Sequence, residues 1–364
     1  MKSAASTPHN KPPPYVPPEG YPDQAPVVIV VMGVCGVGKS TLIKYVTGQE
    51  VVVGHGQEAC TSEVTTFQIP GTNVWMVDTP GFDDTFNDDG TILDRVDQSL
   101  AEFFDQFIPI AGMLYIHDIT KARMQGSAMK NLSMFRKVVG DQNLKNCCIV
   151  TTKWSQQDQA VLSNRENELK TKKHFWQTLI ALGVKTARFE DSKESVLSIV
   201  KPLVEGKGFI PQITVETRVE GKLLADTKAG EEVYANITKL EKQHQATIDD
   251  LKQLHKELVG KKEEDAAEAE RLVKEEMDKL KEELRGLKTQ KDIMTTSTAE
   301  RSSGGRIIKW MAWAGARTIL GVTTLIGGAA LCATANPAGA AAGTAVWIAG
   351  ANALAAIDRA FEGD

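Results

Sequence analysis

A buried strand followed at once by a glycine-rich octet constrains this chain more than any other feature of its sequence. Residues 27–31 read Val-Val-Ile-Val-Val, and residues 33–40 read Gly-Val-Cys-Gly-Val-Gly-Lys-Ser. An unbroken β-branched run is typical of a strand covered on both faces, as in parallel sheets. The octet has the spacing of a phosphate-binding loop (P-loop), and a helical pattern begins directly after it at Thr41. The sequence therefore predicts an α/β domain with a phosphate site at the end of its first strand.

Three further apolar runs extend the same sheet, at residues 74–77, 113–116 and 147–150. The stretches between them are long enough for helical crossovers, which favours a doubly wound α/β fold. We expect this P-loop NTPase domain to occupy residues 27–206 and to close near Val204.

Four other segments complete the predicted organisation: an arm at residues 1–26, a connecting segment at 207–230, a coiled coil at 231–292 and an apolar helical hairpin at 306–364. The arm holds eight of the 14 prolines, which predicts a disordered tail or a docking site for a proline-binding module. Alternation between Phe209 and Val219 predicts a short extended stretch in the connecting segment.

Apolar residues at three-and-four spacing predict two helices on either side of Gly260. The two series are Ile237, Leu240, His244, Leu251, Leu254 and Leu258, then Val273, Met277, Leu280, Leu284 and Leu287. One interpretation is a coiled coil with a break at the glycine. The other is a pair of amphipathic helices packed back on the globular domain.

The octet assigns roles to individual residues. Its glycines let backbone amides turn toward the phosphates, and the helix N-terminus adds positive potential. Lys39 is expected to bridge the β- and γ-phosphates, and Ser40 to bind Mg²⁺. The predicted nucleotide contacts in this part of the chain are Gly33, Gly36, Val37, Gly38, Lys39, Ser40 and Thr41.

Two further elements fit a nucleotide-dependent switch. An Asp-Thr-Pro-Gly motif begins at Asp78, so its carboxylate is expected to hold a water on Mg²⁺ and the Gly81 amide to sense the γ-phosphate. A plain turn is the alternative. The polar stretch before this motif lies where a first switch must supply a threonine to the metal, with Thr61 as the first choice and Thr65 as the second. The predicted metal ligands are therefore Ser40, Thr61 and Asp78.

These motifs resemble one family. The octet, the pair Cys60-Thr61 and the run at residues 78–84 are similar to the septin-related GTPases, which include the immunity-associated (GIMAP) proteins and the chloroplast import receptors. Tyr115-Ile116-His117 and Arg123-Met124 bring the sequence nearest to a branch of uncharacterised fungal G-domain-containing proteins. The resemblance covers roughly residues 27–230. It implies GTP or GDP with Mg²⁺ as the ligand, and dimerisation of G domains across the nucleotide.

The base-recognition motif of such GTPases is altered in this chain. The usual order is Asn or Thr, Lys, any residue and Asp, whereas the chain reads Thr-Lys-Trp-Ser from Thr152 to Ser155. The missing carboxylate would accept the guanine N1 and N2 hydrogens, so Asp158 or another group must replace it to keep specificity. The loop at residues 188–192 is a further source of a base contact. The predicted base contacts are Thr152, Lys153 and Trp154, the last either stacking on the base or packing the loop.

The sequence has no glutamine at the position expected to orient the hydrolytic water. Phe82 stands where many small GTPases keep a water-orienting glutamine, and a phenylalanine cannot orient water. The candidate catalytic residues are His55, Thr61 and Asp83, with Asp84 as a further candidate.

Composition limits the partners. A net charge of −5 leaves no general basic surface, so nucleic acid is not expected as a main partner. Five cysteines without metal-ligand spacing favour a reducing, cytoplasmic compartment over a disulfide framework.

An uncharged segment near the C-terminal end predicts a helical hairpin. Residues 318–357 hold no charged side chain, and two legs of about 18–20 residues would just cross the hydrocarbon core of a membrane. Half of these residues are Ala or Gly, which contribute little transfer free energy. The alternatives are a membrane-associated hairpin and a soluble pair of closely packed helices.

The sequence thus favours a GTP-binding protein with Mg²⁺, a switch or slow GTPase that acts through G-domain dimerisation and a helical C-terminal effector region. Two alternatives stay open. One is a structural assembly protein, a homodimer or larger oligomer that holds nucleotide without hydrolysing it. The other is an ATPase, because the base-recognition motif lacks its carboxylate.

Overall fold

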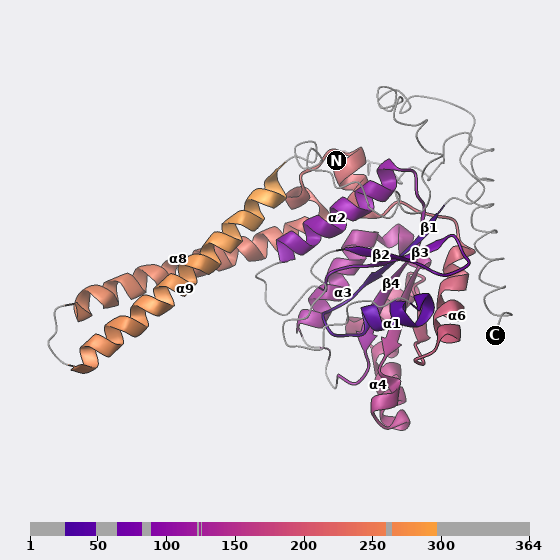
Figure 1. The fold of residues 1–364 in the computed structure, drawn as a ribbon, viewed down its shortest axis with the longest axis horizontal. Coiled ribbons are helices and arrows are strands. Elements are labelled where there is room, and N and C mark those ends of the chain that lie inside the picture. Colours follow the sequence, from indigo (N-terminus) through magenta and orange to yellow (C-terminus); the bar gives the residue numbers. More distant parts are fainter. Residues whose placement is uncertain are drawn as a thin grey trace, which may run out of the picture.

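The computed structural model describes residues 26–48, 64–81, 89–121, 124, 126–259 and 264–296. Within these residues a six-stranded sheet forms the centre of the globular part, with strand order β2-β3-β1-β4-β5-β6 (Figure 1). The strands are β1 (Val27–Met32), β2 (Thr65–Gln68), β3 (Val74–Asp78), β4 (Ile110–Asp118), β5 (Cys147–Thr152) and β6 (Lys185–Arg188). Only β2 runs antiparallel to its neighbour; the other described pairings are parallel.

The predicted doubly wound sheet is confirmed. All four apolar runs are strands, and every residue of β1, β3, β4 and β5 is buried. The two edge strands have weaker sequence signals: β2 was not predicted, and β6 was expected only as a strand before the loop at residues 188–192. Their sequences, Thr-Thr-Phe-Gln and Lys-Thr-Ala-Arg, are short and partly exposed, so they lack the apolar run that marked the inner strands.

Helices cover both faces of the sheet (Figure 1). The α-helices are α1 (Lys39–Thr47), α2 (Asp89–Asp105), α3 (Gly126–Val139), α4 (Gln159–Thr171), α5 (Thr178–Ala181), α6 (Lys193–Val204), α7 (Gln212–Thr214), α8 (Lys228–Leu258) and α9 (Glu264–Thr295). The shorter helical segments are η1 (Asp141–Asn146), η2 (Trp154–Gln156), η3 (Lys173–Gln177), η4 (Val215–Val219) and η5 (Leu224–Asp226). Helices α1 and α6 pack on one face of the sheet, and α2 and α3 on the other.

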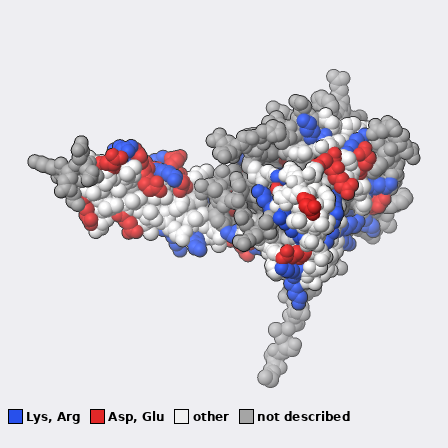
Figure 2. Space-filling view, turned by 90° about the horizontal axis from the view of Figure 1, so that it is seen from below, with Lys and Arg blue, Asp and Glu red and all other residues white. Residues whose placement is uncertain are grey.

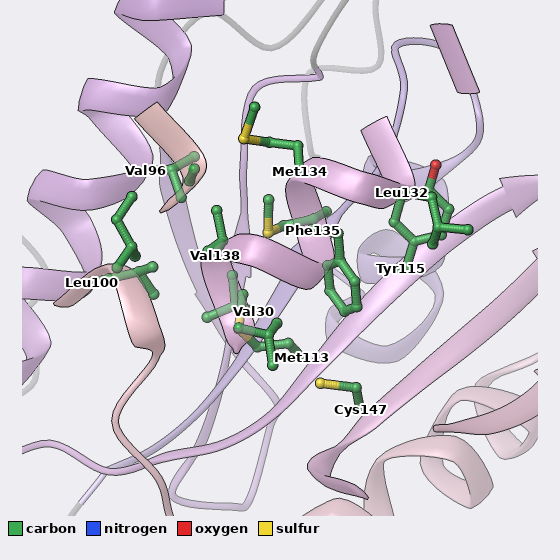
Figure 3. Packing of buried hydrophobic residues seen from close by; sticks show 14 of the residues in the cluster. Val30, Val96, Leu100, Met113, Tyr115, Leu132, Met134, Phe135, Val138 and Cys147 are labelled. Carbon is green, nitrogen blue, oxygen red and sulfur yellow. The ribbon is translucent and has the colours of Figure 1, made fainter. Parts of the chain in front are cut away.

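Strand β1 divides its side chains between the two cores. Val28 and Val30 face the core beneath α2 and α3, whereas Ile29 and Val31 face the core beneath α1 and α6. Figure 3 shows the first core, where the rings of Tyr115 and Phe135 lie 5.4 Å apart. Burial on both faces explains why the strand has no polar alternation.

The connecting segment is helical, contrary to the extended stretch predicted between Phe209 and Val219. Phe209 makes a single bridge to Ile110, and α7 and η4 follow directly. Pro211 precedes α7 with a φ of −58°, which suits the start of a helix. Every residue from Phe209 to Thr217 is buried, including Gln212 and Glu216, so the alternation of polar and apolar residues here does not mark an exposed and a buried face.

Helices α8 and α9 form a long antiparallel pair that projects from the globular part (Figure 1). Lys291 pairs with Glu241 at 2.6 Å near the base, and His255 lies 3.5 Å from Glu270 near the far end, which fixes the direction of the pair. Ile248, Leu280 and Leu284 are buried between the helices. Basic and acidic side chains are interspersed along the face of the pair seen in Figure 2.

The two helices pack on each other, and their bases also pack on the globular part, where Val233, Ile237 and Leu287 join the core beneath α2. Helix α8 ends at Leu258, close to the predicted break. The coiled-coil assignment for residues 231–292 stays a prediction.

Two predicted segments lie outside the described residues: the proline-rich arm up to residue 25 and the C-terminal hairpin at 306–364. Among the helices that the structure does describe, none combines the length and apolar character needed to cross a membrane.

Candidate nucleotide-binding site

The glycine-rich octet forms a loop between β1 and α1, as predicted. Gly33, Gly36 and Gly38 have φ values of 149°, 72° and 100°, which disfavour other residues. Gly33 is also constrained by space, because a β-carbon there would lie 2.6 Å from the carbonyl oxygen of Ile116. The loop needs glycine at these positions to turn its backbone inward.

Lys39 and Ser40 open helix α1 at the end of this loop. Lys39 is 6% exposed, and its Nζ donates to the carbonyl oxygens of Gly33 and Val34, each at 3.1 Å. Ser40 Oγ donates to Oδ2 of Asp78 at 2.5 Å. The predicted phosphate lysine and two of the three predicted metal ligands are therefore brought together by β1, α1 and β3.

The Asp-Thr-Pro-Gly motif packs directly on the loop. Thr79 Oγ1 donates to the carbonyl oxygen of Val31 at 2.8 Å, which ties the end of β3 to β1. A β-carbon on Gly81 would lie 2.6 Å from the backbone nitrogen of Cys35 and 3.0 Å from Nζ of Lys39. The glycine thus allows a contact between the motif and the loop that no larger residue permits.

The donor set fits Mg²⁺ and a nucleotide phosphate. Mg²⁺ keeps several waters and takes one or two protein oxygens together with phosphate oxygens, so the Ser40 hydroxyl and the buried Asp78 carboxylate suffice. No group of three or more His, Cys, Asp or Glu residues that could hold a metal occurs in the part of the chain that the structure describes. A site completed by phosphate is the arrangement these residues suit.

The base-recognition segment adjoins the loop at the end of β5. Thr152 Oγ1 donates to the carbonyl oxygen of Val37 at 2.7 Å, which joins the two segments. Lys153 has a φ of 63°, and its Nζ lies 2.7 Å from Oδ2 of Asp118. The predicted contacts Thr152 and Lys153 therefore border the same edge of the sheet as the P-loop.

Asp118 is a site residue that the sequence analysis did not single out. It is buried at the end of β4, and its Oδ1 accepts hydrogen bonds from the backbone nitrogen and the hydroxyl of Thr120. Burial raises the pKa of Asp118, but the hydrogen bonds and charge of Lys153 and the bonds from Thr120 outweigh it and leave the pKa below its usual value. The carboxylate stays charged and holds Lys153 in place. The position of Asp118 at the end of a buried apolar strand is the sequence feature that could have identified it.

Trp154 packs in the protein core. It is 5% exposed, its Nε1 donates to Thr151 Oγ1 at 2.9 Å, and the Arg188 guanidinium carbon lies 3.9 Å from its ring centroid. These contacts favour the packing interpretation over stacking on a base.

The carboxylate that was proposed to replace the missing acceptor is engaged elsewhere. Asp158 Oδ1 accepts from the backbone nitrogens of Ala160 and Val161 and so caps helix α4. Ser155 Oγ instead donates to Oδ2 of Asp191, at 3.1 Å, in the loop at residues 188–192.

The proposed hydrolytic residues cannot be placed. His55, Thr61, Asp83 and Asp84 lie outside the described residues. Thr65, the second choice for the metal, begins β2 opposite Asp78 and is exposed.

The cysteines depart in part from the expectation of free thiols. Cys35, in the loop, is disulfide-bonded, whereas Cys147 and Cys148 are free and buried in β5.

The sequence model of the 50S ribosome-binding GTPase family matches residues 28–175. This segment has a P-loop GTPase fold. No curated protein matches the chain.

Similar solved structures include three GTPases. Toc33 from Arabidopsis thaliana in complex with Mg²⁺ and GMPPNP is 19% identical over 47% of this chain and 72% of its own, with a TM-score of 0.37. The bacterial selenocysteine-specific elongation factor EF-Sec is 16% identical over 50% of this chain, with a TM-score of 0.35, and the match spans only 28% of its length. A single-residue variant of Era from Aquifex aeolicus bound to GDP·AlF4⁻ is 17% identical over 50% of this chain and 58% of its own, with a TM-score of 0.34.

Proposed function

We propose that this protein binds GTP and GDP with Mg²⁺ and works as a nucleotide switch or slow GTPase of the septin-related type. The observation that carries the proposal is the convergence of Lys39, Ser40, Asp78 and Gly81 at one glycine-rich loop, with Ser40 and Asp78 joined at 2.5 Å. These are the groups needed to hold a triphosphate and its metal. The family match to residues 28–175 supports guanine as the base.

Each residue then has a defined task. The loop amides and the N-terminus of α1 face the phosphates, and Lys39 exchanges the Gly33 and Val34 carbonyls for phosphate oxygens. Mg²⁺, when bound, would supply positive charge to the phosphates. Ser40 would be its protein ligand, and Asp78 would act on it through a water. Gly81, already in contact with the loop, is placed to report whether a γ-phosphate is present.

The nucleotide signal has a short route to the helical pair. Helix α2 is the first described element after Gly81, and its Gly90 backbone nitrogen donates to Oε1 of Gln290 in α9 at 3.0 Å. A β-carbon on Gly90 would lie 3.1 Å from Ile237 in α8, so the two long helices contact the start of α2 closely. We propose that movement of the motif that includes Gly81 reaches α2 along the chain and shifts the base of the pair. We propose α8 and α9 as the effector region.

Assembly and location complete the proposal. G-domain dimerisation across the nucleotide, with further self-association through α8 and α9, is the expected output, in the cytoplasm or on a membrane through residues 306–364. A structural protein that holds nucleotide without hydrolysing it is the second candidate, because Phe82 leaves no water-orienting side chain after Gly81.

Binding is tested by titrating the protein with fluorescent GTP and GDP analogues, with Mg²⁺ and with EDTA. The proposal predicts saturable binding of both and tighter triphosphate binding with Mg²⁺. Absence of binding in both buffers would refute it. Phosphate release under the same conditions then separates a slow GTPase from the structural alternative.

Coupling is tested by hydrogen exchange of the α9 amides with GDP and with a non-hydrolysable GTP analogue. We expect exchange at the base of α9 to differ between nucleotides in the native protein and to lose that difference in Gln290→Ala. Lys288→Ala, at an exposed position two residues away, is the matched control and should keep the difference. An equal response of the native protein to both nucleotides would contradict the route.

A further inference from the structure

The carboxylate missing from the base-recognition motif is present on the neighbouring loop. Ser155, at the position where the motif expects an aspartate, donates its hydroxyl to Oδ2 of Asp191 at 3.1 Å. Strands β5 and β6 are parallel neighbours, so the loops that follow them leave the same edge of the sheet. Asp191 therefore stands beside the position from which the base acceptor is expected.

Two other carboxylates at this edge, those of Asp158 and Asp118, are occupied. Asp158 caps helix α4 through Oδ1. Asp118 accepts from Lys153 on one oxygen and from Thr120 on the other. Among the described residues, Asp191 Oδ1 accepts no hydrogen bond, while its Oδ2 is held by Ser155. Asp191 thus keeps an oxygen for a ligand.

The backbone around Asp191 is fixed on both sides. The Phe189 backbone nitrogen donates to the carbonyl oxygen of Thr151 at 2.9 Å, and the Ser192 hydroxyl caps α6 by accepting from the backbone nitrogen of Ser195 at 3.1 Å. Asp191 itself has a φ of 52°. Aspartate and asparagine tolerate this left-handed conformation better than most residues. The carboxylate is therefore held rather than carried on a free loop.

We infer that Asp191 supplies the carboxylate that recognises the N1 and N2 hydrogens of guanine, with Ser155 as the residue that positions it. The inference rests on the proposed GTP-binding function. In this arrangement the carboxylate lies on the loop after β6, and a hydroxyl stands on the loop after β5 where the motif expects a carboxylate. Adenine presents a lone pair at N1 and no amino group at C2, so a carboxylate here selects against it.

Replacing the Asp191 carboxylate by an amide tests whether it recognises guanine. Xanthine has a carbonyl oxygen at C2 where guanine has an amino group, so an amide N–H is the matching partner. Asp191→Asn should lower GTP affinity by about 100-fold, since the bond to N1–H loses its charge and the amide N–H groups face the guanine amino group, and it should raise XTP affinity above that of the native protein. Asparagine fits the same backbone conformation, and thermal unfolding should confirm that the variant folds.

Asp158→Asn is the matched control, because asparagine caps a helix as well as aspartate does. It should leave the GTP to XTP affinity ratio unchanged. The double exchange Ser155→Asp with Asp191→Ser should regain GTP affinity over Asp191→Ser alone. An unchanged ratio in a folded Asp191→Asn protein would overturn the inference while leaving the GTP site intact. A native protein that binds no guanine nucleotide would instead remove the proposed function itself.

Discussion

Replacing Gly81 by alanine tests the contact between the Asp-Thr-Pro-Gly motif and the phosphate loop. The added β-carbon would lie 2.6 Å from the Cys35 nitrogen and 2.8 Å from its Cα. Both are backbone atoms, so neither can rotate away. The two segments must separate by about 0.8 Å to reach the 3.4 Å at which ordinary contact begins.

The size of the effect follows from this overlap. An added methyl group in a well-packed place costs about 1–3 kcal/mol, and here the strain is relieved when the motif leaves the loop. GTP binding needs the motif to approach the γ-phosphate, whereas GDP binding does not. We therefore expect Gly81→Ala to weaken GTP affinity by about 5-fold to 150-fold and to change GDP affinity little.

Fluorescent-analogue titrations of both nucleotides measure this difference. Gly286→Ala is the control, because a β-carbon there meets no heavy atom within 4 Å and alanine favours the helix. It should leave both affinities unchanged. Equal losses for GTP and GDP in Gly81→Ala, or no loss for either, would refute the reasoning.

Lys39→Ala should abolish binding of a fluorescent GTP analogue, because this lysine is expected to neutralise phosphate charge. The unfolding midpoint should stay close to that of the native protein, and unchanged affinity would refute the role of Lys39. Asp78→Asn should weaken triphosphate binding more than diphosphate binding in Mg²⁺ titrations, and equal losses would contradict a role through the metal. Burial lowers the pKa of His117 from 6.5 to about 4, although the charge of Asp118 acts to raise it. Between pH 6.5 and 4 the unfolded chain therefore binds a proton at His117 that the folded protein does not. The free energy of unfolding should fall by up to about 3 kcal/mol between pH 6.5 and 4, as measured by urea titrations. His117→Phe should reduce this fall, and a fall of the same size in the variant would contradict a role for His117. Deleting residues 306–364 should move the protein from liposomes to the soluble fraction in flotation without loss of nucleotide affinity, whereas full-length protein that never floats would defeat the membrane prediction.

The inner part of the fold was predictable because its signals are local. The β-branched run at residues 27–31 and the octet at residues 33–40 each fix a conformation within a few residues, and the structure confirms a strand, a loop and a helix. The connecting segment was not predictable from alternation. Its residues from Phe209 to Thr217 are buried whether polar or apolar, and a short pattern of this kind does not distinguish a buried helix from a strand.

The base-recognition edge could be predicted only in part. Sequence identified Thr152 and Lys153 and the absence of an aspartate at Ser155. It did not reveal the pair Lys153 with Asp118 or the pair Ser155 with Asp191, which join residues 35 and 36 positions apart. Such contacts depend on strand order, which brings the ends of β4, β5 and β6 together and is not encoded in any single motif.

Competition between GTP and ATP for a bound fluorescent GTP analogue tests the central claim most directly. The purified protein is loaded with the analogue and Mg²⁺, and each unlabelled nucleotide is added in increasing concentration. We expect GTP to displace the analogue at a concentration about 100-fold or more below that of ATP, because the site offers an acceptor for guanine hydrogens. Displacement by ATP at the same or a lower concentration would contradict it.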